Sequence, residues 1–129
     1  MECSCNIDAG VGDDGYEEIA QYMKYSKSKH KCGECGKTIK PGEKYEYYKG
    51  RFDGEFHIHK TCIDCLSLRE HFFGDWIFES TWEMFQEHMD ECFWQVPEKC
   101  LAKVTSNTRA KICEMIEEYW MENEEDEEA

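Results

Sequence analysis

The sequence has no long apolar run, and this absence bounds the class of protein. A membrane-spanning helix needs about 20 consecutive apolar residues, whereas the mean hydropathy of these 129 residues is −0.81. The N-terminal residues do not resemble a secretion signal. We therefore expect a soluble cytoplasmic protein with no membrane partner.

The sequence also lacks the common motifs of catalytic sites. It contains no Gly-rich phosphate loop, no nucleophile elbow and no His-Glu-x-x-His pair. Among 29 acidic residues, no pair stands out as a general acid and base. We therefore predict that the protein is not an enzyme and has no small-molecule substrate.

Positive charge is scarce and concentrated in one segment. The chain carries 15 Lys and Arg against 29 Asp and Glu, for a net charge of −14. Residues 24–60 hold ten of the bases against five acids, whereas residues 61–129 hold five bases against 18 acids. Because a net negative charge repels phosphate at long range, nucleic acid is a disfavoured partner unless residues 24–60 form a locally basic face.

Cysteine, by contrast, is abundant, with nine residues in the chain. Two Cys-x-x-Cys pairs, Cys32 with Cys35 and Cys62 with Cys65, have 26 residues between them. Zinc binds four such ligands in a tetrahedron, and each pair supplies two of them from one short turn. Paired cysteines without a secretion signal favour metal over disulfide. We predict a structural zinc site held by these four thiolates.

An alternative set of four zinc ligands includes His59. It precedes Cys62 by three positions, so it could replace Cys65 as the fourth ligand. We favour the four-cysteine set because both pairs then have the same two-residue spacing. Four protein ligands close the coordination shell to water, which argues against a catalytic metal.

The residues around the two pairs predict a knuckle, a hairpin and a helix. Gly33 and Gly36 supply the positive φ that a tight turn between two ligands favours. Residues 44–49 and 55–60 alternate like strands. Apolar residues at helical spacing follow Cys65, which places the second pair in the first turn of a helix, where the helix dipole favours thiolates.

This pattern resembles a treble-clef zinc finger, whose two halves the two Cys-x-x-Cys pairs match. The spacing of Cys32, Cys35, His59 and Cys62 is also similar to the first half of a LIM domain, without the remaining ligands of a second LIM site. The resemblance covers residues 32 to about 73. The whole chain resembles small phage and prophage proteins that begin with Cys-x-Cys and carry one such finger. That likeness implies no activity, but it implies the cytoplasm of a bacterial host cell.

Cys3 and Cys5 stand one residue apart near the N-terminus. One interpretation makes them ligands of a second zinc or of a cluster with the first, so the expected number of zinc ions is one or two. The other makes them free thiols near a chain end. The sequence favours neither.

Aromatic residues interleave with Lys and Arg in the hairpin region. In a nucleic-acid-binding finger, exposed aromatics would stack on bases while the cations contact the backbone. We favour the alternative that Tyr45, Tyr47 and Phe56 form the finger's own core, because a small zinc domain has little else to bury. The candidate contact residues of this region are Tyr47, Tyr48, Lys49, Arg51 and Phe52.

The segments on either side of the finger differ in how clearly they predict helices. Residues 16–29 fit either a short helix or an extended lead-in. After the finger, apolar residues at helical spacing predict two or three helices, the first of them capped by Ser80. Cys92, Cys100 and Cys113 lie on the apolar faces of these helices, where we expect core packing rather than a second metal site.

The predicted fold class is α+β, with a small treble-clef finger and a C-terminal packing unit of two to three helices. An N-terminal extension (1–31) precedes the finger (32–75), and a helical unit packed on the finger follows it (76–121). The like-charged acidic end (122–129) is expected to be disordered.

Three functions are compatible with this sequence. The first is a non-enzymatic protein-interaction module in which zinc is structural, with another protein as the partner; we favour this one. The second is an acidic mimic of nucleic acid, a phage counter-defence inhibitor of a host nucleic-acid-handling protein. The third is a nucleic-acid-binding finger that uses residues 24–60. A treble clef can also host a nuclease of the His-Asn-His type, but the accompanying Asn and second His are missing here.

Overall fold

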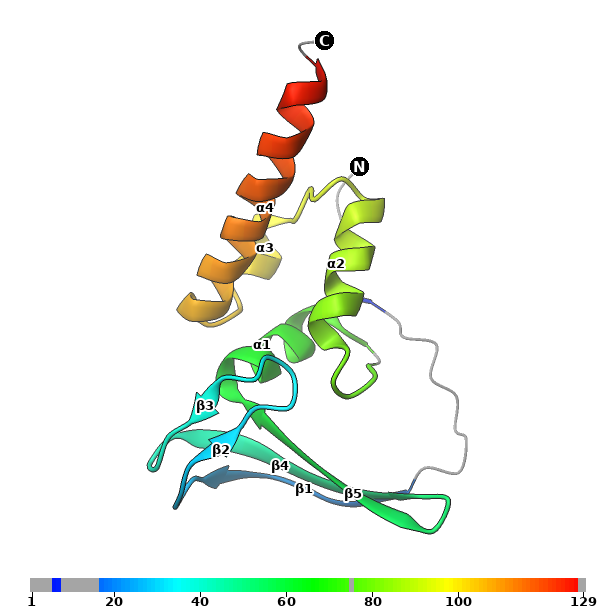
Figure 1. The fold of residues 1–129 in the computed structure, drawn as a ribbon, viewed down its shortest axis with the longest axis vertical. Coiled ribbons are helices and arrows are strands. Elements are labelled where there is room, and N and C mark those ends of the chain that lie inside the picture. Colours follow the sequence, from blue (N-terminus) through cyan, green and yellow to red (C-terminus); the bar gives the residue numbers. More distant parts are fainter. Residues whose placement is uncertain (1–5, 8–16, 75, 128–129) are drawn as a thin grey trace.

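The computed structural model describes residues 6–7, 17–74 and 76–127, and these form an α+β fold (Figure 1). Strands occupy the first half of the chain and helices the second. The elements are β1 (Glu17–Tyr25), β2 (His30–Lys31), β3 (Thr38–Ile39), β4 (Lys44–Phe52), β5 (Glu55–Cys62), α1 (Ile63–Phe72), α2 (Thr81–Glu91), α3 (Glu98–Leu101) and α4 (Ser106–Glu127).

Three antiparallel strands in the order β1-β4-β5 form the main sheet. β4 and β5 are joined by Asp53 and Gly54, both with positive φ (52° and 79°), as a two-residue hairpin turn requires. The predicted hairpin is therefore present. Residues 17–25 form β1 rather than a short helix, because β4 offers hydrogen-bonding partners along the whole segment.

The two faces of this sheet have different surroundings. On one face, Glu46 of β4 forms a buried ion pair with Arg69 of α1, and Tyr48 packs on Phe78. We call this the covered face. Side chains alternate along a strand, so Tyr47, Lys49 and Arg51 point to the opposite side, which we call the open face. In Figure 1 the helices lie on one side of this sheet.

The buried residues form two clusters. The smaller cluster surrounds the two Cys-x-x-Cys pairs and comprises Cys32, Ile39, Tyr45, Cys62 and Cys65. The larger cluster joins the helices and comprises Ile7, Leu68, Phe72, Phe73, Phe85, Met89, Cys92, Trp94, Cys100, Val104 and Ile112. Trp82 of α2 packs against both clusters and so connects the metal-proximal part of the protein to the helical part.

Two expectations about the C-terminal half need correction. α4 continues to Glu127, so its backbone is helical beyond residue 121, where the tail was expected to become disordered. Cys113 of α4 is exposed rather than part of the core. Cys92 and Cys100 are buried as expected, but both are disulfide-bonded.

None of the helices in the described ranges is long and apolar enough to span a membrane.

Candidate metal centre

The first cysteine pair lies in a tight turn between β2 and β3. The backbone N–H of Cys32 donates to the carbonyl of Lys37, and that of Gly36 donates to the carbonyl of Cys32, both at 2.9 Å. Gly36 has the predicted positive φ of 74°, whereas Gly33 is not among the residues with positive φ. The N–H of Glu34 donates to Cys32 Sγ at 3.4 Å. This turn therefore brings Cys32 and Cys35 close together, and the N–H of Glu34 stabilises negative charge on Cys32.

The second pair lies where β5 passes into α1. Cys62 is the last residue of β5 and the N-cap of α1, and Cys65 lies in the first helical turn, as predicted. The N–H of Cys62 donates to Cys32 Sγ at 3.4 Å, which joins the two pairs directly. The N–H of Gly33 donates to the carbonyl of Lys60 at 2.9 Å, so the first turn is also fastened to β5.

The four sulfurs meet in one cluster. The Sγ atoms of Cys32, Cys35, Cys62 and Cys65 all lie within 4.8 Å of one another, and all four thiols are free. The Sγ atoms of Cys35 and Cys62 are 3.9 Å apart. Zinc–thiolate bonds of about 2.3 Å in a tetrahedron place neighbouring sulfurs about 3.8 Å apart. The cluster therefore brings together the four ligands that a zinc ion needs, and the Cys35–Cys62 pair already has the tetrahedral spacing.

Protonation of these thiols is coupled, because they are close and largely buried. Hydrogen bonds from the thiols of Cys62 and Cys65 lower the pKa of Cys32. The hydrogen bond between Cys62 and Cys32 raises the pKa of Cys62 to about 12, and the hydrogen bond between Cys65 and Cys32 raises the pKa of Cys65. Without a metal the site therefore retains thiol protons. A bound dication would displace these protons, because zinc binds thiolates.

Trp82 contributes a hydrogen bond that the spacing of the cysteines did not reveal. Its indole Nε1 donates to Cys65 Sγ at 3.2 Å, from α2, 17 residues further along the chain. Lys111 of α4 lies over the indole ring, with Nζ 4.0 Å from the ring centroid. In the sequence Trp82 was only one apolar position of a helix. Its role depends on how α2 packs against α1, which no local pattern shows.

Asp64, between the two cysteines of the second pair, fastens α4 to the metal centre. Its carboxylate accepts hydrogen bonds from Thr105 Oγ1 at 2.7 Å and from Lys37 Nζ at 3.3 Å. Burial would raise the pKa of Asp64, but the hydrogen bonds from Thr105, Lys37 and Asn107 outweigh it and lower the pKa. The carbonyl of Asp64 also accepts from Thr108 Oγ1 at 2.7 Å. The start of α4 is therefore held against the first turn of α1.

A cavity of about 300 Å³ opens beside the sulfur cluster. Cys35 is the one exposed member of the four, whereas Cys32, Cys62 and Cys65 are each at most 5% exposed. The cavity is lined by Cys35, Lys37, Cys62, Asp64, Cys65, Trp82, Asn107, Thr108 and Lys111. A small chelator or oxidant can therefore reach the cluster from the side of Cys35.

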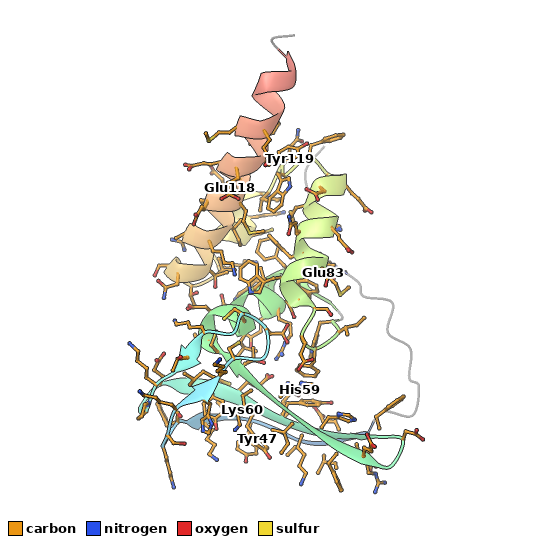
Figure 2. The ribbon with its side chains drawn as sticks, viewed as in Figure 1. Tyr47, His59, Lys60, Glu83, Glu118 and Tyr119 are labelled. Atoms are coloured by element: carbon orange, nitrogen blue, oxygen red, sulfur yellow. The ribbon has the colours of Figure 1, made fainter. Side chains whose placement is uncertain are left out.

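His59, the alternative fourth ligand, lies elsewhere. It stacks on Phe78 with ring centroids 4.1 Å apart and an interplanar angle of 5°. The centroid of the Tyr48 ring lies 6.1 Å from that of His59. Burial among these rings lowers the pKa of His59. Among the described residues, the group suited to a metal contains Cys65 and not this histidine. Figure 2 locates His59 in the sheet with Tyr47 and Lys60, apart from α2 and α4.

The predicted contact residues of the hairpin are distributed over both faces of the sheet. Tyr47, Lys49 and Arg51 point to the open face, whereas Tyr48 is buried on the covered face. Phe52, at the end of β4, is 43% exposed.

Tyr45 is a core residue, as expected of the finger's aromatics, but Phe56 is 58% exposed and Tyr47 is half-buried. The preference for an all-core assignment was therefore wrong for Phe56. The proposed second metal ligands, Cys3 and Cys5, lie outside the described residues.

A Trp82→Phe variant tests the indole hydrogen bond. Phenylalanine retains most of the apolar contact but removes the N–H donor. Mutating a residue that hydrogen-bonds to a metal ligand typically lowers metal affinity by about 10- to 100-fold. We expect zinc affinity to fall within that range while zinc content at saturating metal stays unchanged. Competition with a chromogenic chelator measures it. An unchanged affinity would show that the hydrogen bond to Cys65 contributes nothing to metal binding.

Comparisons with known proteins identify no relative of this chain. A scan against models of protein families finds no match, and searches of curated proteins and of solved structures likewise find none.

Proposed function

We propose that this protein is a zinc-stabilised, non-enzymatic interaction module whose contact surface is the open face of the β1-β4-β5 sheet. The observation that carries the proposal is the set of large apolar side chains left exposed on that face. Tyr22, Phe56 and Ile58 are 49%, 58% and 53% exposed. Phe56 and Ile58 are neighbours on this face of β5, and Tyr22 of β1 stacks on Tyr47 of β4, so apolar side chains occur on all three strands. Exposed apolar patches on a folded domain are typical of interaction sites.

The metal centre supports a structural rather than a catalytic role for zinc. Its four protein ligands leave no coordination position for water or substrate. The ligands come from the β2-β3 turn, the end of β5 and the first turn of α1, in the order expected of a treble-clef finger. Zinc bound there would hold together the elements that carry the open face.

Position-specific photo-crosslinking tests the contact surface. A photoreactive amino acid replaces either Ile58, on the open face, or Ile77, an isoleucine of similar exposure (53% and 46%) outside the sheet. In cells of the native host, we expect irradiation to give adducts from position 58 and not from position 77. Adducts at both positions, or at neither, would contradict the proposed contact surface.

A further inference from the structure

Cross-strand register arranges the open face in rows. Antiparallel partners point to the same side of a sheet. One row contains Tyr22, Tyr47 and Lys60, and the next contains Ala20, Lys49 and Ile58. A third row contains Glu17, Arg51 and Phe56. Aromatic rings and cations therefore alternate across one continuous surface made by three strands.

Two of the aromatic rings on this face restrain each other by stacking. Tyr22 and Tyr47 stack on each other with ring centroids 5.2 Å apart and an interplanar angle of 30°. Phe56 lies two rows away, about 13 Å along the strand at two residues per row. These two aromatic platforms are far enough apart to bind successive parts of one extended ligand.

Cations accompany both platforms. Lys24 Nζ lies 5.7 Å from the centroid of the Tyr47 ring, and Lys49 Nζ lies 4.8 Å from that of Phe56. Arg51 forms an exposed ion pair with Glu17 at 2.8 Å. With Lys60, this face carries four cations against one acid, although the whole chain has a net charge of −14. Its charge is therefore opposite to that of the rest of the molecule and complementary to a polyanion.

We propose that the open face binds single-stranded nucleic acid, with bases stacked on the Tyr22–Tyr47 pair and on Phe56 and phosphates beside the lysines and Arg51. This proposal rests on the proposed function, for which it names the partner. Exposed aromatics interleaved with cations are what sequence-tolerant single-strand binding requires. Base stacking needs unpaired bases, so a duplex should bind more weakly. The net charge opposes long-range attraction, and binding should therefore be moderate and salt-sensitive.

Fluorescence anisotropy with labelled oligonucleotides of about 12 residues, in single-stranded and duplex form, tests the proposal. We expect the single strand to bind more tightly than the duplex, and raising salt from about 50 to about 200 mM to weaken binding by tenfold or more. Tyr22→Ala should weaken single-strand binding by about tenfold or more, the effect of losing one stacked base.

Tyr25→Ala is the matched control. Tyr25 belongs to the same strand and is 65% exposed, but it pairs with Lys44 and points to the other side of the sheet. Its removal should leave binding unchanged. Lys49→Gln should reduce the salt dependence without changing the preference for single strands. Zinc content and thermal unfolding verify that each variant folds.

Three results of the binding experiments would overturn the single-strand proposal, and a fourth comes from the crosslinking. One is no binding of folded protein to the oligonucleotides at low salt. The second is equal losses for Tyr22→Ala and Tyr25→Ala. The third is a dimer in solution that Tyr22→Ala dissociates and Tyr25→Ala does not, which would assign the face to a second copy. Crosslinks from position 58 to proteins alone would contradict nucleic acid while leaving the interaction module intact. Absent crosslinks there would contradict the module itself.

Discussion

A Cys65→Ser variant is expected to lose its zinc and to unfold at a much lower temperature than the native chain. Cys65 is 2% exposed, and its sulfur accepts the Trp82 hydrogen bond at the junction of the two cores. A serine hydroxyl is a poor zinc ligand. In small zinc domains metal binding supplies on the order of 10 kcal/mol of folding free energy, so losing one ligand should destabilise the sheet and α1 together. Elemental analysis and circular dichroism during heating measure the two effects.

Cys113→Ser is the control for this variant, because Cys113 is a free thiol on the exposed surface of α4. It should retain full zinc content and an unchanged melting temperature. Treating the native chain with a strong chelator should reproduce the effect of Cys65→Ser, since the cavity beside Cys35 gives access to the cluster. Full zinc retention in Cys65→Ser would show that another residue completes the coordination.

Arg69→Met is expected to destabilise the fold by about 3–5 kcal/mol, because it leaves a buried carboxylate without its cation. The side chains of Arg69 and Glu46 are 4% and 6% exposed, and Glu46 otherwise accepts only from Gln21 Nε2 at 3.0 Å among the described residues. Glu46 Oε1 already lacks a hydrogen-bond partner there. Urea denaturation followed by circular dichroism gives the free energy of unfolding.

Arg51→Met is the matched comparison, because Arg51 forms the exposed ion pair with Glu17, with side chains 50% and 59% exposed. Exposed pairs contribute about 0–1 kcal/mol, so this change should have little effect on stability. Combining Arg69→Met with Glu46→Leu should recover much of the lost stability, since the unpaired charge is then gone. Equal effects of Arg69→Met and Arg51→Met would show that burial of the first pair does not matter.

Local spacing predicted which four cysteines cluster, because metal coordination is partly a local property. A Cys-x-x-Cys pair can supply two ligands wherever it lies, and Cys62 and Cys65 could be placed in a first helical turn from the apolar spacing that follows them. The β4-β5 hairpin was likewise predictable, since the alternation of side chains and the Asp53-Gly54 turn are read within a few residues.

The elements that were missed depend on distant partners. Residues 17–25 could be read as helix or strand, and they form a strand because β4 supplies the hydrogen bonds from partners as distant as Arg51, which pairs with Glu17. The indole of Trp82 reaches Cys65 only after α2 has packed on α1. The same applies to Asp64, whose carboxylate accepts the hydrogen bond from Thr105 only after α4 has docked.

The sequence by itself determined the α+β class, the four clustered cysteines and the contrast between a basic hairpin region and an acidic remainder. Only the tertiary structure decided which aromatics are exposed. Tyr47 and Tyr48 are neighbours with the same side chain, yet Tyr47 points to the open face and Tyr48 packs on Phe78. Alternation along a strand predicts that the two differ, but which one is buried depends on the side of the sheet that the helices cover.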